Sequence, residues 1–432
     1  MRDFLTKWKI IFIILLIYIP IFTKTSKELE FIILYYILIS IFFFQIIYFN
    51  QIFYIDIKII VYFLIGLVFI IIQILPIEQN LLKYLSPKSA YYLSLIENTN
   101  YYSISLNFFN TLKYLLIYLS ACMIIIGIRN IIKTKRDLLS TYRFFFLITF
   151  FYIFYSYFSY LNHNKNLDGL SSTIINRNNF CFYLILCFIS LLSYMNFFKK
   201  YFYHKKNDFI QFILSDIFIA RIAIVLISIG IILTKSRSGN TTFLVILIFY
   251  FALDYLRNKK LTFTSKIIIS IFFIDIFLIN YFVGLNQVIS RFAEINYTNE
   301  ELRIDTFQFS FSNLKNFLFF GYGLGNFESL FRLEIGLNNY FYDHVHNDYL
   351  EFFGELGLIG SLIFFIIFIK FTRYIINFQK LVFLKDQFFL IFLACAIHGL
   401  FDFALHMPSI IYVTVFLFGL SSCKLKRSII IK

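Results

Sequence analysis

The sequence predicts an all-α, polytopic integral membrane protein, and three observations lead to that prediction. The 432-residue chain is 60% hydrophobic, 22% aromatic and only 15% charged, unlike a water-soluble domain. Apolar runs of about 18 residues or more, long enough to cross a bilayer, recur along most of the chain. Backbone polar groups in lipid must be satisfied within the segment, so each run should be a helix. Strands of a membrane barrel would alternate apolar and polar residues, and these runs do not.

Twelve runs are predicted to cross the membrane, with one larger external loop between the ninth and the tenth. The first run lacks the small-residue cleavage site of a signal peptide and leads directly into the second, so we expect it to be the first helix. We find no internal repeat or linker, which predicts a single transmembrane domain over residues 1–432. The runs cover residues 9–22, 29–49, 52–75, 111–128, 143–161, 179–198, 209–233, 240–256, 265–284, 348–370, 385–401 and 409–423.

The distribution of basic residues predicts the orientation of these spans. The chain holds 39 Lys and Arg against 24 Asp and Glu, a net charge of +15. If the N-terminus is cytoplasmic, the connections rich in Lys and Arg all fall on the cytoplasmic side, as the positive-inside rule requires. These connections are residues 129–137, 199–208, 257–266, 370–386 and the C-terminal tail. We therefore expect both termini in the cytoplasm, and no nucleic-acid partner, because no soluble basic face is available.

Two longer segments then lie on the external side. Residues 76–110 contain two prolines and several tyrosines, and residues 285–347 are the one stretch long enough for a small folded cap. The five cysteines lie in or beside predicted spans without C-x-x-C spacing. Neither a disulfide framework nor a cysteine zinc site is therefore expected.

The densest polar cluster, DHVHNDYLEFFGELGLIG at 343–360, stands at the external edge of the tenth span. His346 precedes a helix that should start near Asn347 or Asp348, where the positive end of the helix dipole disfavours an imidazolium. His346 is therefore a candidate for a neutral general base near pH 7. The H-x-H-x-D spacing of His344, His346 and Asp348 also matches a zinc site, and this alternative stays open.

Glycines mark two further features of the same region. Gly357 and Gly360 would let another helix or a lipid chain approach closely. The segment GYGLGNF at 321–327 resembles a phosphate-binding loop at first sight. No strand precedes it and no G-K-[ST] follows it, so a tight turn is the better interpretation.

Three arginines need an explanation. Arg221 lies near the middle of the seventh span, where a charge costs about 2.5–3.5 kcal/mol and should face a partner or a cavity. It either pairs with another helix or lines the cavity of an anionic ligand. Arg237 follows the same span at an external turn, either as an anchor to lipid headgroups or as a bidentate phosphate ligand. Arg303 opens an amphipathic stretch of the large external loop.

A last polar group lies near the C-terminus, in HGLFDFALHMP at 398–408. His398, Asp402 and His406 are spaced by four, so they share one helix face if the helix continues to Pro408. They form either a structural His–Asp pair or a polar wall of the same external cavity.

Taken in order, four stretches of the chain resemble one family. The resemblance is to the O-antigen ligase superfamily of polytopic bacterial membrane proteins, and it runs over roughly residues 170–410, a ligase-like core. Its most specific part is the His-Asn-x-x-Leu-Glu…Gly-x-x-Gly pattern, whereas the first 150 residues match only as generic spans. The stretches are STIINRNNFCFYL (172–184), LTKSRSG (233–239), the segment from Arg303 to GYGLGNF, and HVHNDYLEFFGELGLIG followed by HGLFDFALHMP.

The resemblance implies a metal-independent, inverting glycosyltransferase without cofactors in the bacterial inner membrane. It would move a glycan from an undecaprenyl-diphosphate carrier to a hydroxyl of lipid A-core, of another glycan or of a protein on the periplasmic face. The loop at 285–347 would form part of the active-site cap. The residues implied are His346 as the catalytic group, Arg237 and Arg303 on the diphosphate, Arg221 and Arg177 as further diphosphate candidates, and Asn347, His398 and Asp402 in support.

Within the superfamily, the sequence does not separate a ligase from a polymerase or a protein O-oligosaccharyltransferase. Outside it, a flippase for lipid-linked glycan would share the bundle and the anionic cargo. A flippase should carry ionisable residues along a route through both leaflets. Here the polar residues concentrate on the external side, which favours an enzyme.

Overall fold

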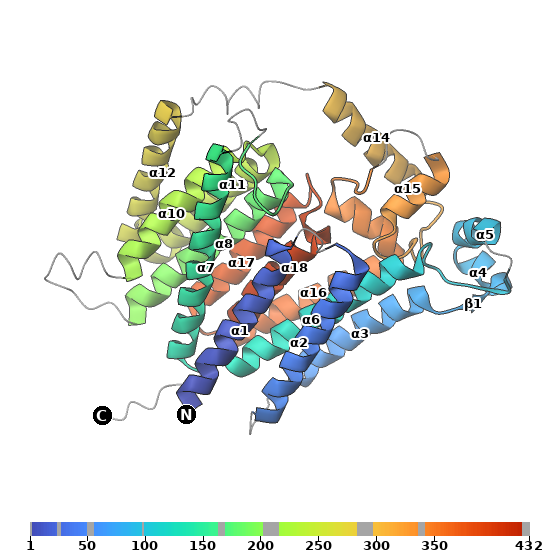
Figure 1. Cartoon of the computed structure of the whole chain (residues 1–432), viewed down its shortest axis with the longest axis horizontal. Helices are drawn as coiled ribbons and strands as arrows, with labels where there is room; N and C mark the ends of the chain where they lie inside the picture. Colours follow the sequence, from blue (N-terminus) through green and yellow to red (C-terminus); the bar gives the residue numbers. More distant parts are fainter. Residues whose placement is uncertain are drawn as a thin grey trace, which may run out of the picture.

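The computed structural model describes residues 2–23, 27–49, 56–96, 99–162, 169–201, 216–282, 297–335 and 342–425. Each predicted span overlaps a helix, and these helices pack into one bundle (Figure 1). Residues 52–55, 209–215 and 283–284 of the predicted spans lie outside the described residues. They are α1 (Arg2–Phe22), α2 (Leu29–Phe49), α3 (Ile57–Ile74), α6 (Phe108–Ile131), α7 (Lys135–Asn162), α8 (Arg177–Tyr201), α10 (Asp216–Leu233), α11 (Arg237–Asn258), α12 (Phe263–Phe282), α16 (Asp348–Phe378), α17 (Val382–His398) and α18 (Pro408–Ser421).

Length and composition make seven helices of the described chain candidates to cross a membrane: α2, α3, α6, α7, α8, α11 and α16. The protein is thus an all-helical membrane protein in its main architecture, and the count of twelve spans stays a prediction. Among these seven, α8 stands apart, because 94% of its most apolar window is buried inside the protein, against 28–44% in the others. A helix that is apolar on every side is expected at the centre, and α8 packs against α7, α10, α11, α17 and α18.

Connections predicted to share one side of the membrane contact each other. At one end of the bundle, Arg257 in the last turn of α11 pairs with Asp386 of α17. At the same end, Arg129 of α6 donates to the Tyr374 hydroxyl of α16 at 2.9 Å. At the other end, Lys27 between α1 and α2 lies 3.5 Å from Asp343. The chain therefore keeps the predicted cytoplasmic and predicted external connections in two separate groups.

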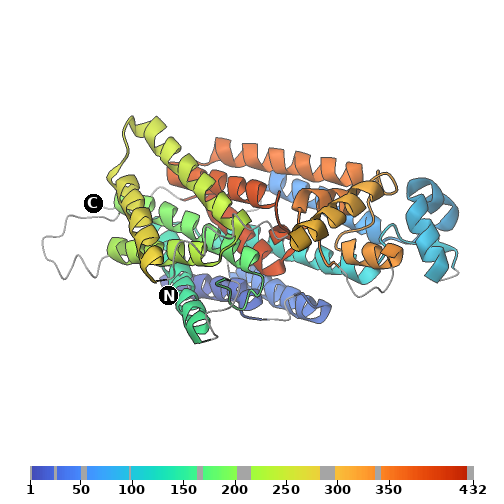
Figure 2. The same ribbon diagram turned by 90° about the horizontal axis from the view of Figure 1, so that it is seen from above.

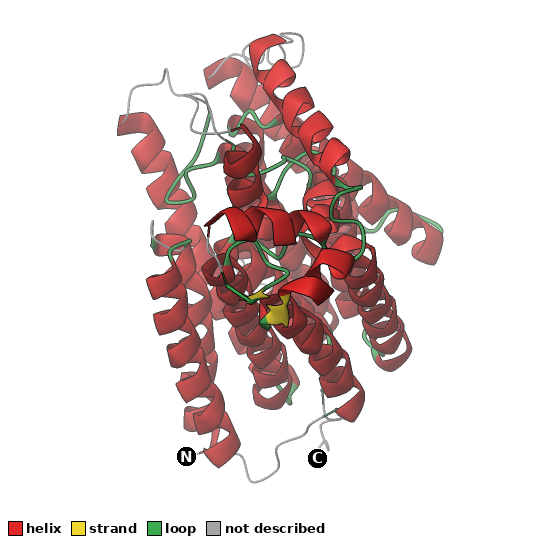
Figure 3. Ribbon diagram, turned by 90° about the vertical axis from the view of Figure 1, so that its right-hand side faces the viewer, coloured by secondary structure: helices red, strands yellow, loops and turns green. Residues whose placement is uncertain are grey.

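The described parts of the two predicted external segments contain short helices. Residues 76–110 hold α4 (Gln79–Leu85), α5 (Pro87–Ile96) and an antiparallel pair of two-residue strands, β1 (Ile77–Glu78) and β2 (Tyr101–Tyr102). This pair, yellow in Figure 3, is a small exception to the all-α prediction. Figure 2 shows α4 and α5 at the opposite end of the molecule from α12.

The larger external segment, 285–347, contains α14 (Tyr297–Asn313) and α15 (Phe327–Ile335), and its residues 285–296 and 336–341 lie outside the described chain. The two helices pack through aromatic rings, with Phe309 of α14 4.9 Å from Phe331 of α15 between centroids. Both helices contact α16. The segment thus lies against the start of α16.

The helix α16 is broken at Gly357, whose φ of 66° and ψ of −175° are not helical. The glycine-rich turn at 321–325 lies against the break. Leu358 N donates to Leu318 O at 2.7 Å, and Tyr322 N donates to Gly354 O at 3.1 Å. The turn supplies hydrogen bonds that the interrupted helix lacks, as backbone buried in a membrane bundle requires. The prediction of a tight turn is confirmed, and its role is structural.

Both glycines of the predicted close-approach pair allow such a contact. A Cβ on Gly360 would lie 2.4 Å from the Phe69 ring of α3, so helix α3 approaches there, as predicted. A Cβ on Gly357 would lie 2.4 Å from Gly321 N, so the neighbour at that point is the turn rather than a helix.

Candidate functional site

The segment between α17 and α18 folds back onto the start of α16. Helix α17 ends at His398, a turn follows, and residues Ala404–His406 form the short helix η1 before Pro408 begins α18. The condition under which His398, Asp402 and His406 would share one helix face is therefore not met, because α17 ends before Asp402. The turn is closed by Asp348 N, which donates to Gly399 O at 2.8 Å and to Asp402 O at 3.2 Å.

His346 lies where these two segments meet. Its Nδ1 is 3.5 Å from Oδ1 of Asp402, and its side chain is 25% exposed, whereas Asp402 is fully buried. Burial alone would raise the pKa of Asp402, but the neighbouring imidazoles of His346 and His398 hold it below the usual range. A buried carboxylate thus faces one imidazole nitrogen, which leaves Nε2 as the nitrogen available to a ligand.

Asn347 supports the same loop. It is the N-cap of α16, and its side-chain oxygen accepts from Leu350 N at 3.0 Å. Its Nδ2 donates to Leu400 O at 3.1 Å, across to the α17–α18 turn. Asn347 therefore connects the start of α16 to the segment that carries Asp402.

Arg303 reaches this region from α14. Thr306, one turn later on the same face of the helix, donates through Oγ1 to Val345 O at 3.2 Å. Val345 is fully buried and immediately precedes His346. Arg303 itself is half-buried, and the contact between Thr306 and Val345 places its helix turn beside the His346 loop.

Arg177 and Arg237 are the first residues of α8 and α11. The starts of these helices are in contact, since a Cβ added to Gly239 would lie 2.2 Å from Cys181 Sγ. One residue further along α8, the Phe182 ring stacks on His398 at 4.6 Å between centroids. Two arginine-bearing helix N-termini thus lie at the same end of the bundle as the His398–Asp402 turn.

Arg221 is the predicted site residue that the structure does not bring to this end. It lies 12 residues, about 18 Å along the axis, before the end of α10. Its guanidinium carbon is 5.9 Å from the centroid of the Phe263 ring, at the start of α12. Because that start belongs to the opposite group of connections, Arg221 is not part of the site around His346.

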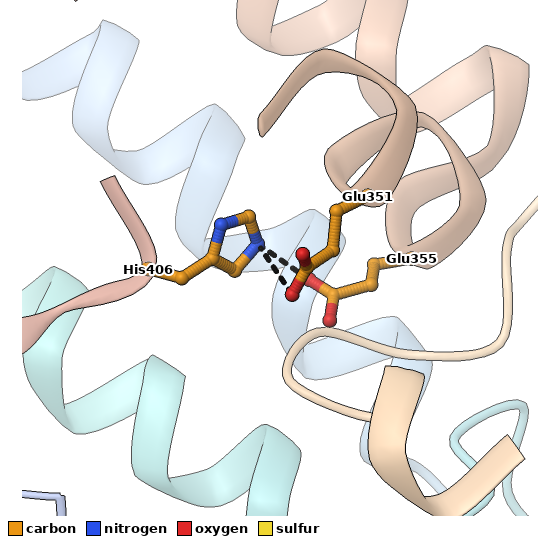
Figure 4. Close-up of side chains that lie close together, drawn as sticks. All are labelled: Glu351, Glu355 and His406. Carbon is orange, nitrogen blue, oxygen red and sulfur yellow. Dashed lines mark ion pairs between the residues drawn. The ribbon is translucent and has the colours of Figure 1, made fainter. Parts of the chain in front are cut away.

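The region also holds a buried acidic cluster that the sequence analysis did not assemble. Its members are Asp348, Glu351 and Glu355 of α16 together with His406 of η1, each exposed by 2% or less. His406 Nδ1 lies 2.7 Å from Asp348 Oδ1, and its Nε2 lies 3.6 Å from Glu351 and 3.4 Å from Glu355 (Figure 4). Burial alone would lower the pKa of His406, but the charge of Glu351 and the bonds to Asp348 and Glu355 raise it well above its ordinary value.

A signal for this cluster was present in the sequence. Positions 348, 351 and 355 are spaced by three and four, so their side chains lie on one face of a helix. Three carboxylates on one face of a predicted span need a buried counter-charge. The spacing could not identify His406 as that partner, because the turn after α17 brings it there.

The open alternative of an H-x-H-x-D zinc site does not match the geometry. His344 Nδ1 lies 2.7 Å from Glu351, His346 faces Asp402, and Asp348 faces His406. Within the described chain, a different set, Glu351, Glu355 and His406, has one ligand atom from each residue within 4.8 Å of the others. Such atoms could hold a metal, but here the imidazole of His406 serves as the cation between the carboxylates.

Comparison with known proteins agrees with the motifs. Residues 222–365 match the family model described as O-antigen ligase. The matched segment contains Arg237, Arg303 and His346, whereas Arg177 and Asp402 lie outside it. No curated protein matches the chain. The family match confirms the resemblance to the O-antigen ligase superfamily that the motifs indicate, over this segment of the chain.

Proposed function

We propose that the protein is a membrane glycosyltransferase of the O-antigen ligase type. It transfers a glycan from an undecaprenyl-diphosphate carrier to an acceptor hydroxyl on lipid A-core, another glycan or a protein, and it uses no metal or other cofactor. One observation carries the proposal. His346, beside the buried carboxylate of Asp402, lies at the end of the bundle where Arg177 and Arg237 begin their helices and where Arg303 approaches from α14.

The arginines bind the diphosphate of the carrier. A guanidinium presents paired N–H donors that match two phosphate oxygens. The N-termini of α8 and α11 add the positive ends of two helix dipoles. As the glycosidic bond breaks, negative charge grows on the departing diphosphate, and donors already aimed at it stabilise the transition state.

His346 acts as the general base. Its Nε2 takes the proton of the acceptor hydroxyl while that oxygen attacks the anomeric carbon from the face opposite the diphosphate. The new C–O bond forms as the bond to the diphosphate oxygen breaks, so the anomeric centre inverts and undecaprenyl diphosphate leaves with the bond's electrons. Asp402 orients the imidazole through Nδ1 and stabilises the imidazolium that forms.

The reaction takes place at the external face of the inner membrane. The lipid tail of the carrier must stay in the bilayer while its sugar reaches water, which needs polar chemistry at the rim of an apolar bundle. The distribution of basic connections supports this side for His346 and the cytoplasm for both termini. The folded segment of 285–347, lying against the start of α16, forms part of the cap over the site.

Gene deletion and complementation test the proposal. In the deletion strain, lipid-linked sugars are analysed by mass spectrometry after complementation with wild type, His346→Ala or Arg257→Lys, a control at the far end of α11. Wild type and control should restore surface glycan, and His346→Ala should not, although it inserts in normal amounts. Wild-type surface glycan with His346→Ala would remove His346 from catalysis.

The accumulated intermediate decides among the related activities. Complete polymers waiting on the carrier indicate a ligase, and single repeat units indicate a polymerase. Loss of glycan from proteins alone indicates a protein oligosaccharyltransferase. Carrier-linked glycan that stays on the cytoplasmic leaflet would contradict the proposal and indicate a flippase.

A further inference from the structure

The backbone of His346 adopts a left-handed conformation, with a φ of 61°. Two other non-glycine residues of the described chain have positive φ, Lys235 and Lys259, and both follow the end of a helix, where such a conformation is common. His346 instead precedes the N-cap of a helix. A non-glycine residue in this region is strained, and the surrounding structure must hold it there.

Both carboxylate oxygens of Glu351 help to restrain the backbone at His346. Oε2 accepts from Val345 N at 2.8 Å, and Oε1 lies 2.7 Å from His344 Nδ1. The side chain therefore fixes the two residues that precede His346. On the opposite side of the same segment, Thr306 donates to Val345 O. The backbone leading into His346 is thus held from α16 on one side and from α14 on the other.

The carboxylate of Glu351 is 1% exposed and needs a counter-charge at that depth. His406 provides it, with Nε2 3.6 Å from Glu351 Oε1. The imidazole of His406 is itself held by Asp348 and Glu355, and the Tyr114 hydroxyl of α6 donates to its backbone carbonyl at 3.1 Å. Figure 4 shows His406 reaching across to both glutamates of α16.

We propose that Glu351 is a positioning residue for His346: it fixes the strained segment 344–346 so that the imidazole faces the acceptor hydroxyl, with His406 as its buried cation. The inference rests on the proposed function, in which His346 is the base. Glu351 touches no substrate in this scheme. Its removal should therefore slow the chemical step without weakening the grip of the arginines on the carrier.

Steady-state kinetics of purified protein in proteoliposomes test this, with a polyprenyl-diphosphate-linked oligosaccharide as donor. Glu351→Gln keeps an acceptor for Val345 N, and Glu351→Ala removes it. We expect kcat per folded molecule to fall about tenfold in the first and about a hundredfold in the second, with KM for the donor unchanged. Glu328→Gln, an exposed glutamate of α15 that pairs with Arg332, is the matched control and should keep wild-type kcat.

Thr306→Val tests the same segment from its other side and serves if the Glu351 variants fold poorly. It should lower kcat severalfold at constant KM. In the double variant Glu351→Gln/Thr306→Val, the loss should differ from the product of the two single losses, because both contacts act on one segment. Independent effects that multiply would overturn the shared role.

Three further results would contradict either the role of Glu351 or the proposed function. Wild-type kcat in Glu351→Gln, or a change in KM alone, would overturn the inference. So would a stoichiometric metal ion in purified wild type that is lost in Glu355→Gln, because His406 would then not be the counter-charge. If wild type itself transfers no glycan under any condition, the proposed function fails instead.

Discussion

At the scale of single residues, the proposed site depends on which arginine lies at the His346 end of the bundle and which one pairs with a carboxylate of the protein at the other end. Arg237 begins α11 at the His346 end, whereas Arg257 near the other end of the same helix pairs with Asp386. The sequence shows two similar arginines, one just before and one just after the predicted span at 240–256. Their positions in the bundle assign them different roles.

This contrast gives a prediction for Arg237→Lys. The charge is retained, but an ammonium cannot reproduce the paired donors of a guanidinium on a phosphate, so transfer should fall roughly tenfold or more. Donor-dependent transfer rates in proteoliposomes measure the effect, with Arg257→Lys as the control on the same helix. Wild-type transfer by Arg237→Lys would make Arg237 a membrane anchor.

The buried cluster predicts how stability depends on pH. His406, facing Asp348, Glu351, Glu355 and Tyr114, has a raised pKa when folded. Its contribution to stability is therefore full below its unfolded pKa of about 6.5 and is lost as the pH rises through the folded value. Asp402 has a lowered folded pKa, so its contribution is present above about pH 3.9 and is lost as the pH falls through the folded value.

Thermal unfolding in detergent, followed from about pH 2 to pH 10, checks both limbs. We expect Tm to decline on the alkaline side, and His406→Gln to reduce that decline while it lowers Tm overall. Asp402→Asn should flatten the acid limb instead. An alkaline limb that is the same in wild type and His406→Gln would contradict the role of His406 as a buried cation.

At the scale of elements, the break in α16 decides the geometry of the site. The first part of the helix carries Asp348, Glu351 and Glu355, and the turn at 321–325 lies against the break. Gly321 has a φ of 71°, and a Cβ there would lie 2.1 Å from Glu355 O. The turn can approach the helix this closely only without a side chain at that position.

Gly321→Ala should therefore destabilise the protein by about 2 kcal/mol or more, through strain at positive φ and displacement of the turn. Tm in detergent is the measurement. Gly127→Ala in α6 is the control, because its Cβ would meet no described neighbour closer than 3.4 Å and alanine favours a helix. Equal Tm values for the two variants would mean that the turn moves freely.

The sequence predicted the helices far better than it predicted the contacts between them. Apolar length locates a span because the bilayer imposes it, and each predicted span has its helix. The break at Gly357 escaped prediction because a glycine in an apolar run has the same local signature whether a helix continues or not. The end of α17 at His398 escaped it for the same reason, since Gly399 and Leu400 interrupt no apolar pattern.

At the scale of the whole molecule, the candidate site combines residues that are far apart in the chain. His346, Arg303 and Arg237 were predicted together from motifs, and the structure brings their elements to one end of the bundle. Arg221 was assigned from its depth in the membrane and from the family resemblance, and neither specifies which end of the bundle its side chain lies near. The ligase-like core at 170–410 stays a prediction.

The side chain of Gln73, on α3, is fully buried and makes three hydrogen bonds to segments about 250 residues away. It donates to Phe320 O and Glu355 O and accepts from Leu324 N. This one amide ties both the interrupted helix and its turn to the first quarter of the polypeptide. An excised recombinant fragment of 222–365 would leave these groups without their partner, so the matched segment is not an autonomous unit and transfer should be reconstituted with all 432 residues.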